Sequence, residues 1–228
     1  MHIPDGFLNT KLAAGLLAGG LAVLGFCLSK VLKAVTVLVG ALAGNDGNSK
    51  MSLGRLAFSQ NSGAYFRKLA LIAIWVFAAQ MFNIPIQSAT SAHLIGGVFA
   101  AILVGPFAGF VIISSVLIVQ SLFFGDGGVY ALGANIVNMA FIGSFLSFYI
   151  YKALAKRNYY AAVLIACSFS VLAAALLCLV EVWISGTISF GEALKDMMSL
   201  HAVFALLETA ITLILVKAFR AIEGEDNE

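Results

Sequence analysis

The chain has 228 residues, of which 61% are hydrophobic and 11% charged, and its mean hydropathy is +1.02. A soluble globular domain carries about 25% charged residues, so this composition excludes that class. The formal net charge of +2 is too small to indicate a partner nucleic acid. The apolar runs are continuous rather than alternating, which excludes an outer-membrane barrel and predicts an all-α integral membrane protein.

Apolar segments separated by charges, Gly or Pro predict seven transmembrane helices. They lie near residues 12–32, 67–84, 93–105, 107–124, 132–152, 159–185 and 198–219. The third segment is too short to cross a bilayer alone, and residues 83–92 before it are predicted to be non-helical backbone that dips into the protein. Such backbone is tolerated at membrane depth only where protein or a cavity satisfies it, so this stretch indicates a binding site.

The distribution of basic residues predicts the orientation of the helices. With the N-terminus outside and the C-terminus in the cytoplasm, only Lys11 and Lys195 of the 13 basic residues lie outside. Lys11 is the single basic residue before the first apolar run, and the chain does not open on a basic segment, so we expect no cleavable signal. We expect one seven-helix domain over residues 1–220, with an inserted polar cytoplasmic loop at 44–66 and an acidic cytoplasmic tail at 221–228.

Two of the three histidines lie near the predicted outer face, because His2 follows the amino terminus and His93 begins the third span. The amine of Met1 can chelate one metal ion together with the peptide nitrogen and Nδ1 of His2, and these three nitrogens lie nearly in a plane. A fourth nitrogen from His93 would complete a square. Square-planar nitrogen coordination suits Ni(II) or Cu(II), whereas zinc prefers a tetrahedron. The peptide nitrogen must lose its proton, so binding should strengthen as the pH rises.

Other roles for these residues stay open at this stage. His2 could belong to a loose terminus, and His93 could line a pore or lie at the level of the lipid headgroups. On the last span, His201 could be a fifth group close to the metal, and Glu208 is expected to accept hydrogen bonds inside the bundle. Glu181 could be a surface carboxylate or a metal contact.

The stretch FFGDGGVYALGANIVNM at 123–139 is rich in glycine and polar residues. Its glycines allow a tight outer turn, in which we expect Asp126 to accept hydrogen bonds from loop amides. Asn135 and Asn138 share a helix face and could form inter-helical hydrogen bonds or fix the histidine loop. With Asp5 of the Pro-Asp-Gly turn and His201, these residues are the candidates for the surroundings of the metal.

The remaining features of the chain concern packing. The three cysteines, Cys27, Cys167 and Cys178, lie in apolar stretches without ligand spacing, so we expect packed small side chains. In the first span, small residues at four-residue spacing permit close approach of another helix, inside the bundle or from a partner. These are Ala14 with Ala18 and Gly15 with Gly19.

Four segments in this order, MHIPDGFL, IPIQSATSAHLIGG, LFFGDGGVYALGANIVNMAFIG and LHAVFALLETAIT, closely resemble a known family. It is the substrate-binding membrane subunit, or S component, of energy-coupling factor transporters for nickel or cobalt, the NikM/CbiM type. The likeness runs over about residues 1–220, apart from 44–66. It implies a metal site built from Met1, His2 and His93, with nickel favoured over cobalt because Pro-Asp follows His-Ile where the cobalt branch has Met-Glu.

The resemblance also implies partners. They are a membrane coupling subunit, cytoplasmic ATPase subunits and a small accessory membrane subunit, in the plasma membrane of a prokaryote. The chain itself would be no enzyme, and no phosphate-binding loop occurs in it. A self-sufficient secondary transporter or channel for Ni(II) or Co(II) is the alternative. A membrane metalloenzyme is a further possibility, but the sequence lacks a zinc motif such as H-E-x-x-H.

Overall fold

A computed structural model describes residues 1–43, 52–86 and 90–223, with side chains at 1–35, 63–86 and 90–222. The described helices are α1 (Thr10–Ala43), α2 (Ser52–Gln80), α3 (Gly97–Val104), α4 (Pro106–Val119), α5 (Leu132–Asn135), α6 (Ser147–Ala155), α7 (Tyr159–Ile184) and α8 (Phe190–Glu223). Two π-helical stretches, η1 (Gln120–Phe124) and η2 (Ile136–Leu146), continue α4 and join α5 to α6. Strands β1 (Ile84–Pro85) and β2 (Ser91–Ala92) form an antiparallel ladder with Ile84 opposite Ala92.

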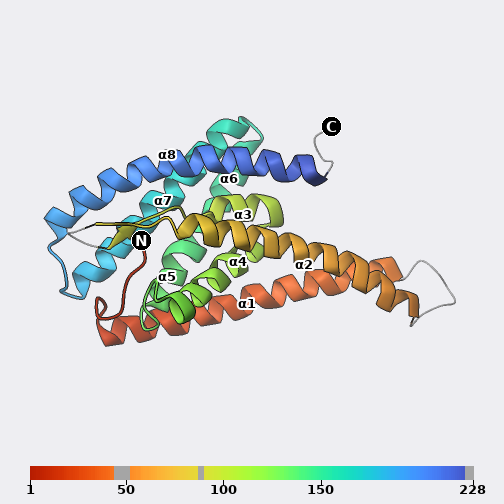
Figure 1. Cartoon of the computed structure of the whole chain (residues 1–228), viewed down its shortest axis with the longest axis horizontal. Helices are drawn as coiled ribbons and strands as arrows, with labels where there is room; N and C mark the ends of the chain where they lie inside the picture. The colour runs from red at the N-terminus through yellow and green to blue at the C-terminus, as the bar shows by residue number, and fades with distance from the viewer. Residues whose placement is uncertain (44–51, 87–89, 224–228) are drawn as a thin grey trace.

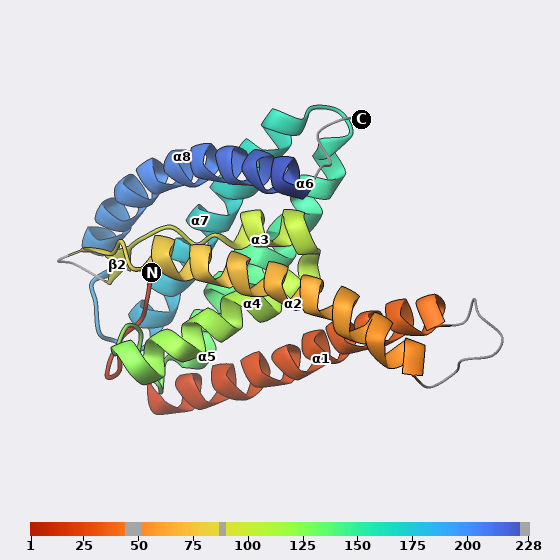
Figure 2. The same ribbon diagram turned by 45° about the vertical axis from the view of Figure 1, so that its right-hand side comes forward.

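The helices pack as a bundle with α3, α4 and α5 between α1 on one side and α8 on the other (Figures 1 and 2). α1 contacts α2, α4 and α5, while α7 contacts α6, α8 and η2. The N-terminus, the β ladder and the connection before α5 lie at one end of the bundle, and the C-terminal end of α8 lies at the other (Figure 1). The amino terminus is therefore placed among segments that are distant in sequence.

Five helical stretches in the described part of the chain are long and apolar enough to cross a membrane. They are Thr10–Val35, Pro106–Phe124, Leu132–Ala155, Tyr159–Ile184 and Phe190–Ile222. This confirms a helical, multi-pass membrane protein. α2, which carries Arg67 and Lys68, and α3, which has 8 residues, are the two remaining predicted segments and are not in this set.

The prediction of a polar loop at 44–66 is wrong for residues 52–66, which are the first part of α2. Residues 44–51 lie outside the described residues. Residues 52–66 contain the helix-favouring Leu, Arg, Ala and Gln among the Gly, Ser and Asn that suggested a loop. Once a helix exists, each added residue gains a hydrogen bond, so α2 extends well beyond its apolar part. For the same reason α8 includes 221–223 of the predicted tail, and 224–228 lie outside the description.

The prediction of non-helical backbone at 83–92 is confirmed for the described residues of that range. Ser91 and Ala92 are buried there, whereas Ile84 and Pro85 are exposed. The β ladder itself was missed, because strands of two residues carry no alternating pattern. The third helix begins at Gly97 rather than at His93, since Gly96 before it has a φ of +72°, outside the helical region.

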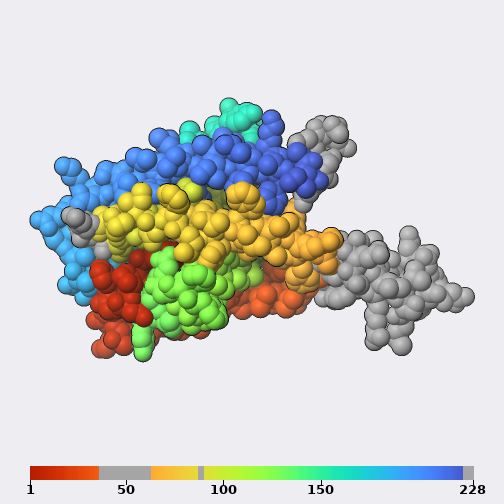
Figure 3. All heavy atoms as spheres, viewed as in Figure 1, coloured from red at the N-terminus to blue at the C-terminus, as the bar shows by residue number. Residues whose placement is uncertain are grey.

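The small residues of α1 face away from the bundle. Ala14, Gly15, Ala18 and Gly19 are exposed, and a Cβ built on either glycine would meet nothing within 4 Å. These residues therefore do not serve packing inside this subunit. The space-filling view shows the first residues of the chain lying directly against the segment around α5 and against the β ladder (Figure 3).

Candidate metal centre

The first residues of the chain turn back into the protein. Phe7 N–H donates to the carbonyl oxygen of Pro4 over 3.4 Å, which closes the predicted Pro-Asp-Gly turn, and Asn9 accepts from Lys11 N–H at the start of α1. Met1 and Ile3 are fully buried and His2 is 4% exposed. The hypothesis that His2 belongs to a loose terminus is therefore wrong.

Hydrogen bonds of Ile3 and Asp5 hold this segment against α5 and the connection before it. Ile3 N–H donates to Asn135 Oδ1 over 2.9 Å, Asn135 Nδ2 donates to Ile3 O over 3.2 Å, and Gly128 N–H donates to the same carbonyl over 3.0 Å. The carboxylate of Asp5 accepts hydrogen bonds from three consecutive backbone amides, those of Val129, Tyr130 and Ala131. Asp5 thus has the role that we predicted for Asp126.

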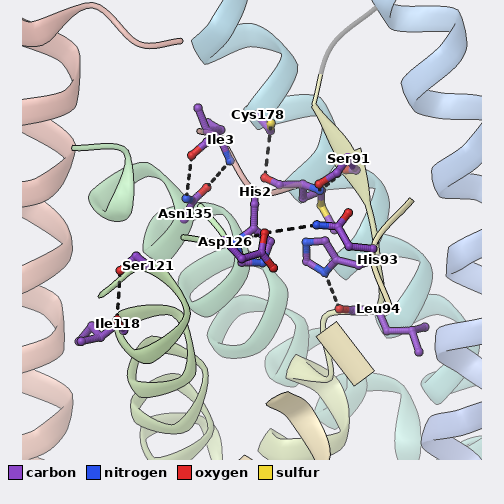
Figure 4. A network of polar contacts seen from close by, with 12 residues as sticks. His2, Ile3, Ser91, His93, Leu94, Ile118, Ser121, Asp126, Asn135 and Cys178 are labelled. Carbon is purple, nitrogen blue, oxygen red and sulfur yellow. Dashed lines mark hydrogen bonds and ion pairs between the residues drawn. The ribbon is translucent and has the colours of Figure 1, made fainter. Parts of the chain in front are cut away.

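The imidazoles of His2 and His93 come together in the interior (Figure 4), close to the buried amine of Met1. The amine donates to the carbonyl oxygen of Ser91 and, over 3.2 Å, to its hydroxyl. The His2 and His93 ring centroids are 4.5 Å apart with an angle of 48° between the ring planes. Two segments that were predicted to converge from distant parts of the sequence are therefore in contact.

The ring nitrogens that remain free are suited to bind a metal. His93 Nδ1 lies 2.7 Å from the carbonyl oxygen of Leu94, so it carries the proton and leaves the lone pair on Nε2. In the described structure, both ring nitrogens of His2 and Nε2 of His93 are buried without a hydrogen-bond partner. Asp126 Oδ1 is 3.7 Å from His2 Nδ1, too far for a hydrogen bond, and accepts from Asn83 Nδ2 over 3.3 Å.

Burial keeps these nitrogens uncharged at neutral pH. Desolvation lowers the pKa of the Met1 amine from its usual 8.0 to about 5, although Cys178 and Asp126 oppose this shift. Desolvation, and then the neighbouring amine, lower the pKa of His2 from 6.5 to about 3. The same two causes hold the pKa of His93 well below its usual range. Burial raises the pKa of Asp126.

The arrangement offers nitrogen donors rather than a conventional cluster of side-chain ligands. Among the described residues, no group of three or more His, Cys, Asp or Glu side chains is placed to hold a metal ion. The two imidazoles need the backbone nitrogens of Met1 and His2 to complete a set of four. Such a set, buried and with an uncharged amine and imidazoles, has the chemistry of a planar Ni(II) or Cu(II) centre once the peptide nitrogen has lost its proton.

The other polar residues have different partners. Asn138 Nδ2 donates to Glu181 Oε2 over 2.7 Å, which is an inter-helical hydrogen bond. Glu181 is only 4% exposed, so its description as a surface carboxylate is wrong. His201 Nδ1 lies 2.7 Å from Met197 O of its own helix, and its Nε2 is buried without a hydrogen-bond partner among the described residues. Glu208 accepts hydrogen bonds inside the bundle, as predicted.

Sequence reasoning missed two neighbours of the amino terminus. Ser91 lies two positions before His93 in the non-helical stretch, and that proximity was the available signal. Cys178 donates from its thiol to the carbonyl oxygen of Met1 over 3.7 Å, and no spacing in the sequence pointed to it. All three cysteines are buried and free, so the prediction of packed small side chains is confirmed.

The fold and this cluster together define a class: a multi-pass helical membrane protein that buries its own amino terminus against two imidazoles. A family model described as CbiM, cobalt uptake substrate-specific transmembrane region, matches residues 52–225. The chain belongs to this family.

Named relatives and solved structures agree with this membership. The chain is 36% identical to a protein from Archaeoglobus fulgidus named as a fused nickel transport protein NikMN, over 93% of this chain and 63% of that protein. It is 39% identical to the cobalt transport protein CbiM of Thermosipho melanesiensis, over 43% of this chain and 42% of that protein. A crystal structure of a transition metal transporter superposes with a TM-score of 0.79 at 29% identity, covering 99% of this chain and 95% of that one. The chain thus spans less than two thirds of the length of these two named relatives.

Proposed function

We propose that this protein is the substrate-binding S component of an energy-coupling factor uptake transporter, and that its substrate is Ni(II) in preference to Co(II). The observation that carries the proposal is the buried amine of Met1 beside the contacting imidazoles of His2 and His93. Relatives named for nickel transport and for cobalt transport support a substrate that is one of these two ions.

In the proposed site, the metal takes the amine of Met1, the peptide nitrogen and Nδ1 of His2, and Nε2 of His93. The free Nδ1 and Nε2 atoms support this set, as does the Leu94 carbonyl that holds the proton on the far side of His93. Four strong nitrogen donors in a plane favour low-spin Ni(II). The planar chelate and the sequence Pro4-Asp5 are therefore the reasons for placing nickel before cobalt.

The proposed partners are a membrane coupling subunit, cytoplasmic ATPase subunits and a small accessory membrane subunit. The fused relative from Archaeoglobus, of which this chain covers 63%, is compatible with a further component beside this one. The protein would lie in the plasma membrane of a prokaryote as seven crossing segments, with the amino terminus and its metal site outside. ATP hydrolysis would belong to the partners.

A self-sufficient secondary transporter or channel is the second candidate function. A proton-coupled carrier needs carboxylates along its path. Glu208 uses both of its oxygens to accept backbone N–H groups, and Glu181 uses one to accept from Asn138. These structural roles favour the S component. Uptake of Ni(II) into vesicles that hold this subunit alone would favour the carrier instead.

The decisive experiment concerns the first residue. Calorimetry with Ni(II) compares the protein that starts at Met1, a version with one residue added before Met1, and a version with a C-terminal tag. An added residue converts the amine into an amide and displaces the chelating nitrogens, although His2, His93 and the fold remain. We expect binding by the first and third versions and loss of binding by the second. Equal affinity of all three would overturn the amino-terminal chelate.

A second comparison separates the two candidate histidines. His93→Ala should reduce the affinity for Ni(II) far more than His201→Ala, because it is the His93 ring whose centroid lies 4.5 Å from that of His2. Bound nickel should be diamagnetic in the parent protein. A paramagnetic, octahedral spectrum would contradict amide coordination. Equal losses of affinity from the two substitutions would contradict the choice of His93 over His201 as the fourth ligand.

A further inference from the structure

Two buried side chains hold the backbone immediately after the histidine segment. Glu208 of α8 accepts Ile95 N–H on Oε2 over 2.9 Å and Gly96 N–H on Oε1 over 2.7 Å. Gln80 at the end of α2 donates from Nε2 to the carbonyl oxygen of Ile95 over 2.7 Å. Glu208 is 2% exposed and Gln80 is fully buried. The peptide groups on both sides of Ile95 are therefore fixed to two different helices.

The backbone leaves little freedom at this point. Gly96 has a φ of +72°, and a Cβ built on it would lie 2.9 Å from Val76 Cγ2 of α2. The two N–H groups that Glu208 accepts precede the first residue of α3, Gly97, where a helix leaves amides unsatisfied and attracts negative charge. Burying a carboxylate is costly unless it is well bonded, and these two amides meet that requirement.

The fixed peptide is connected directly to the imidazole of His93. Leu94 is bonded covalently to Ile95, and its carbonyl oxygen lies 2.7 Å from His93 Nδ1. This contact sets the tautomer and the direction of the ring, so that Nε2 lies beside His2 without a hydrogen-bond partner in the described part of the chain. A displacement of the Ile95 peptide would therefore move the Leu94 carbonyl and turn the imidazole with it.

We propose that Glu208 is a positioning residue of the metal centre: by holding the amides of Ile95 and Gly96, it orients His93 so that Nε2 completes the nitrogen set. This inference rests on the proposed function, because it assigns a role to His93 as a ligand. Outer residues that orient a metal-binding histidine typically contribute about 10–100-fold to metal affinity. Glu208 has no direct contact with the metal in this proposal and acts through the Leu94–Gly96 backbone.

The test measures Ni(II) affinity and the visible absorption spectrum of Glu208→Gln and Glu208→Ala in the full chain. We expect Glu208→Ala to lower the affinity about 10–100-fold, and its absorption band to move to longer wavelength because the fourth nitrogen is lost. Glu208→Gln, which keeps one carbonyl acceptor and nearly the same size, should lie between the parent and Glu208→Ala. Thr209→Val is the matched control, because the hydroxyl of the adjacent Thr209 donates to Ala205 O of its own helix over 2.8 Å.

The double variant Glu208→Ala with His93→Ala distinguishes positioning from a general loss of structure. If Glu208 acts through His93, the double variant should bind Ni(II) no more weakly than His93→Ala alone. Multiplied losses would overturn the proposal, as would a folded Glu208→Gln or Glu208→Ala protein with the parent's affinity and spectrum. If Glu208→Ala does not fold, Glu208→Gln decides the question in the same cycle. If one residue added before Met1 left the Ni(II) affinity of the otherwise unchanged protein the same, that result would instead contradict the proposed function.

Discussion

Asn135 and Ile3 exchange two hydrogen bonds, with Ile3 N–H donating over 2.9 Å and Ile3 O accepting over 3.2 Å. Asn135 lies at the end of α5 and is 1% exposed. Its side-chain amide bonds both the N–H and the C=O of Ile3, as the backbone of a neighbouring β-strand would. Ile3 directly follows His2. The position of the proposed chelate is therefore set by a residue on a different helix.

We predict that Asn135→Ala weakens Ni(II) binding. Loss of two buried hydrogen bonds, each contributing about 1 kcal/mol, corresponds to about a 30-fold loss of affinity if it acts mainly on the docked terminus. Isothermal calorimetry measures this directly. Asn158→Ala is the matched control, because the exposed side chain of Asn158 caps α7 by accepting from Ala161 N–H over 3.0 Å. The control should lose about 1 kcal/mol of stability and no affinity; an equal loss of affinity in both variants would contradict the prediction.

Gly128 provides a second test of the same docking. Its N–H donates to Ile3 O, and a Cβ built on it would lie 1.8 Å from Asp5 Oδ1. Gly128→Ala should therefore push the N-terminal segment out of place and lower Ni(II) affinity by at least tenfold, as for other losses of ligand support.

Gly15→Ala is the control for that substitution, because it adds the same methyl group where nothing lies within 4 Å. In a helix this change should be neutral or slightly stabilising. Affinity measured by calorimetry and stability measured by thermal unfolding in detergent should separate the two variants. Unchanged binding by Gly128→Ala would mean that the metal does not require the docked segment.

The proton balance of metal binding is the third prediction. At pH 7 the amine of Met1, with a pKa of about 5, and His2, with a pKa of about 3, are already neutral because burial disfavours their charged forms. Binding should then release about one proton, that of the His2 peptide, and affinity should rise about tenfold per pH unit between pH 6 and 8. Below pH 5 the dependence should steepen, since the amine must also lose a proton.

Calorimetry in buffers of different ionisation enthalpy counts the released protons. An exposed terminus would behave differently, because an amine with a pKa near 8.0 is mostly protonated at pH 7 and would release close to a second proton. About two protons at pH 7 would therefore contradict a buried, preformed site. An affinity independent of pH would contradict coordination by the peptide nitrogen.

The sequence by itself determined the class of the protein and its candidate ligands. Hydropathy is a local property, so continuous apolar runs were enough to predict a helical membrane protein, and Gly and Pro marked the non-helical stretch before α3. Met1 and His2 are covalent neighbours, so their chelate could be predicted without knowing the fold. The predicted topology placed His93 at the same face, and the family resemblance implied the same three residues.

Only the tertiary structure decided which distant residues meet. Asp5 rather than Asp126 accepts the loop amides, Glu181 is buried against Asn138, and Glu208 holds the backbone after His93. These contacts join segments far apart in the chain, and their partners depend on how the helices pack rather than on any local pattern. The length of α2 was missed for a related reason, since helix propagation outweighs the turn preference of scattered Gly, Ser and Asn. The burial that lowers the pKa values of Met1 and His2 likewise arises only when the N-terminal segment docks against Asn135 and Ser91.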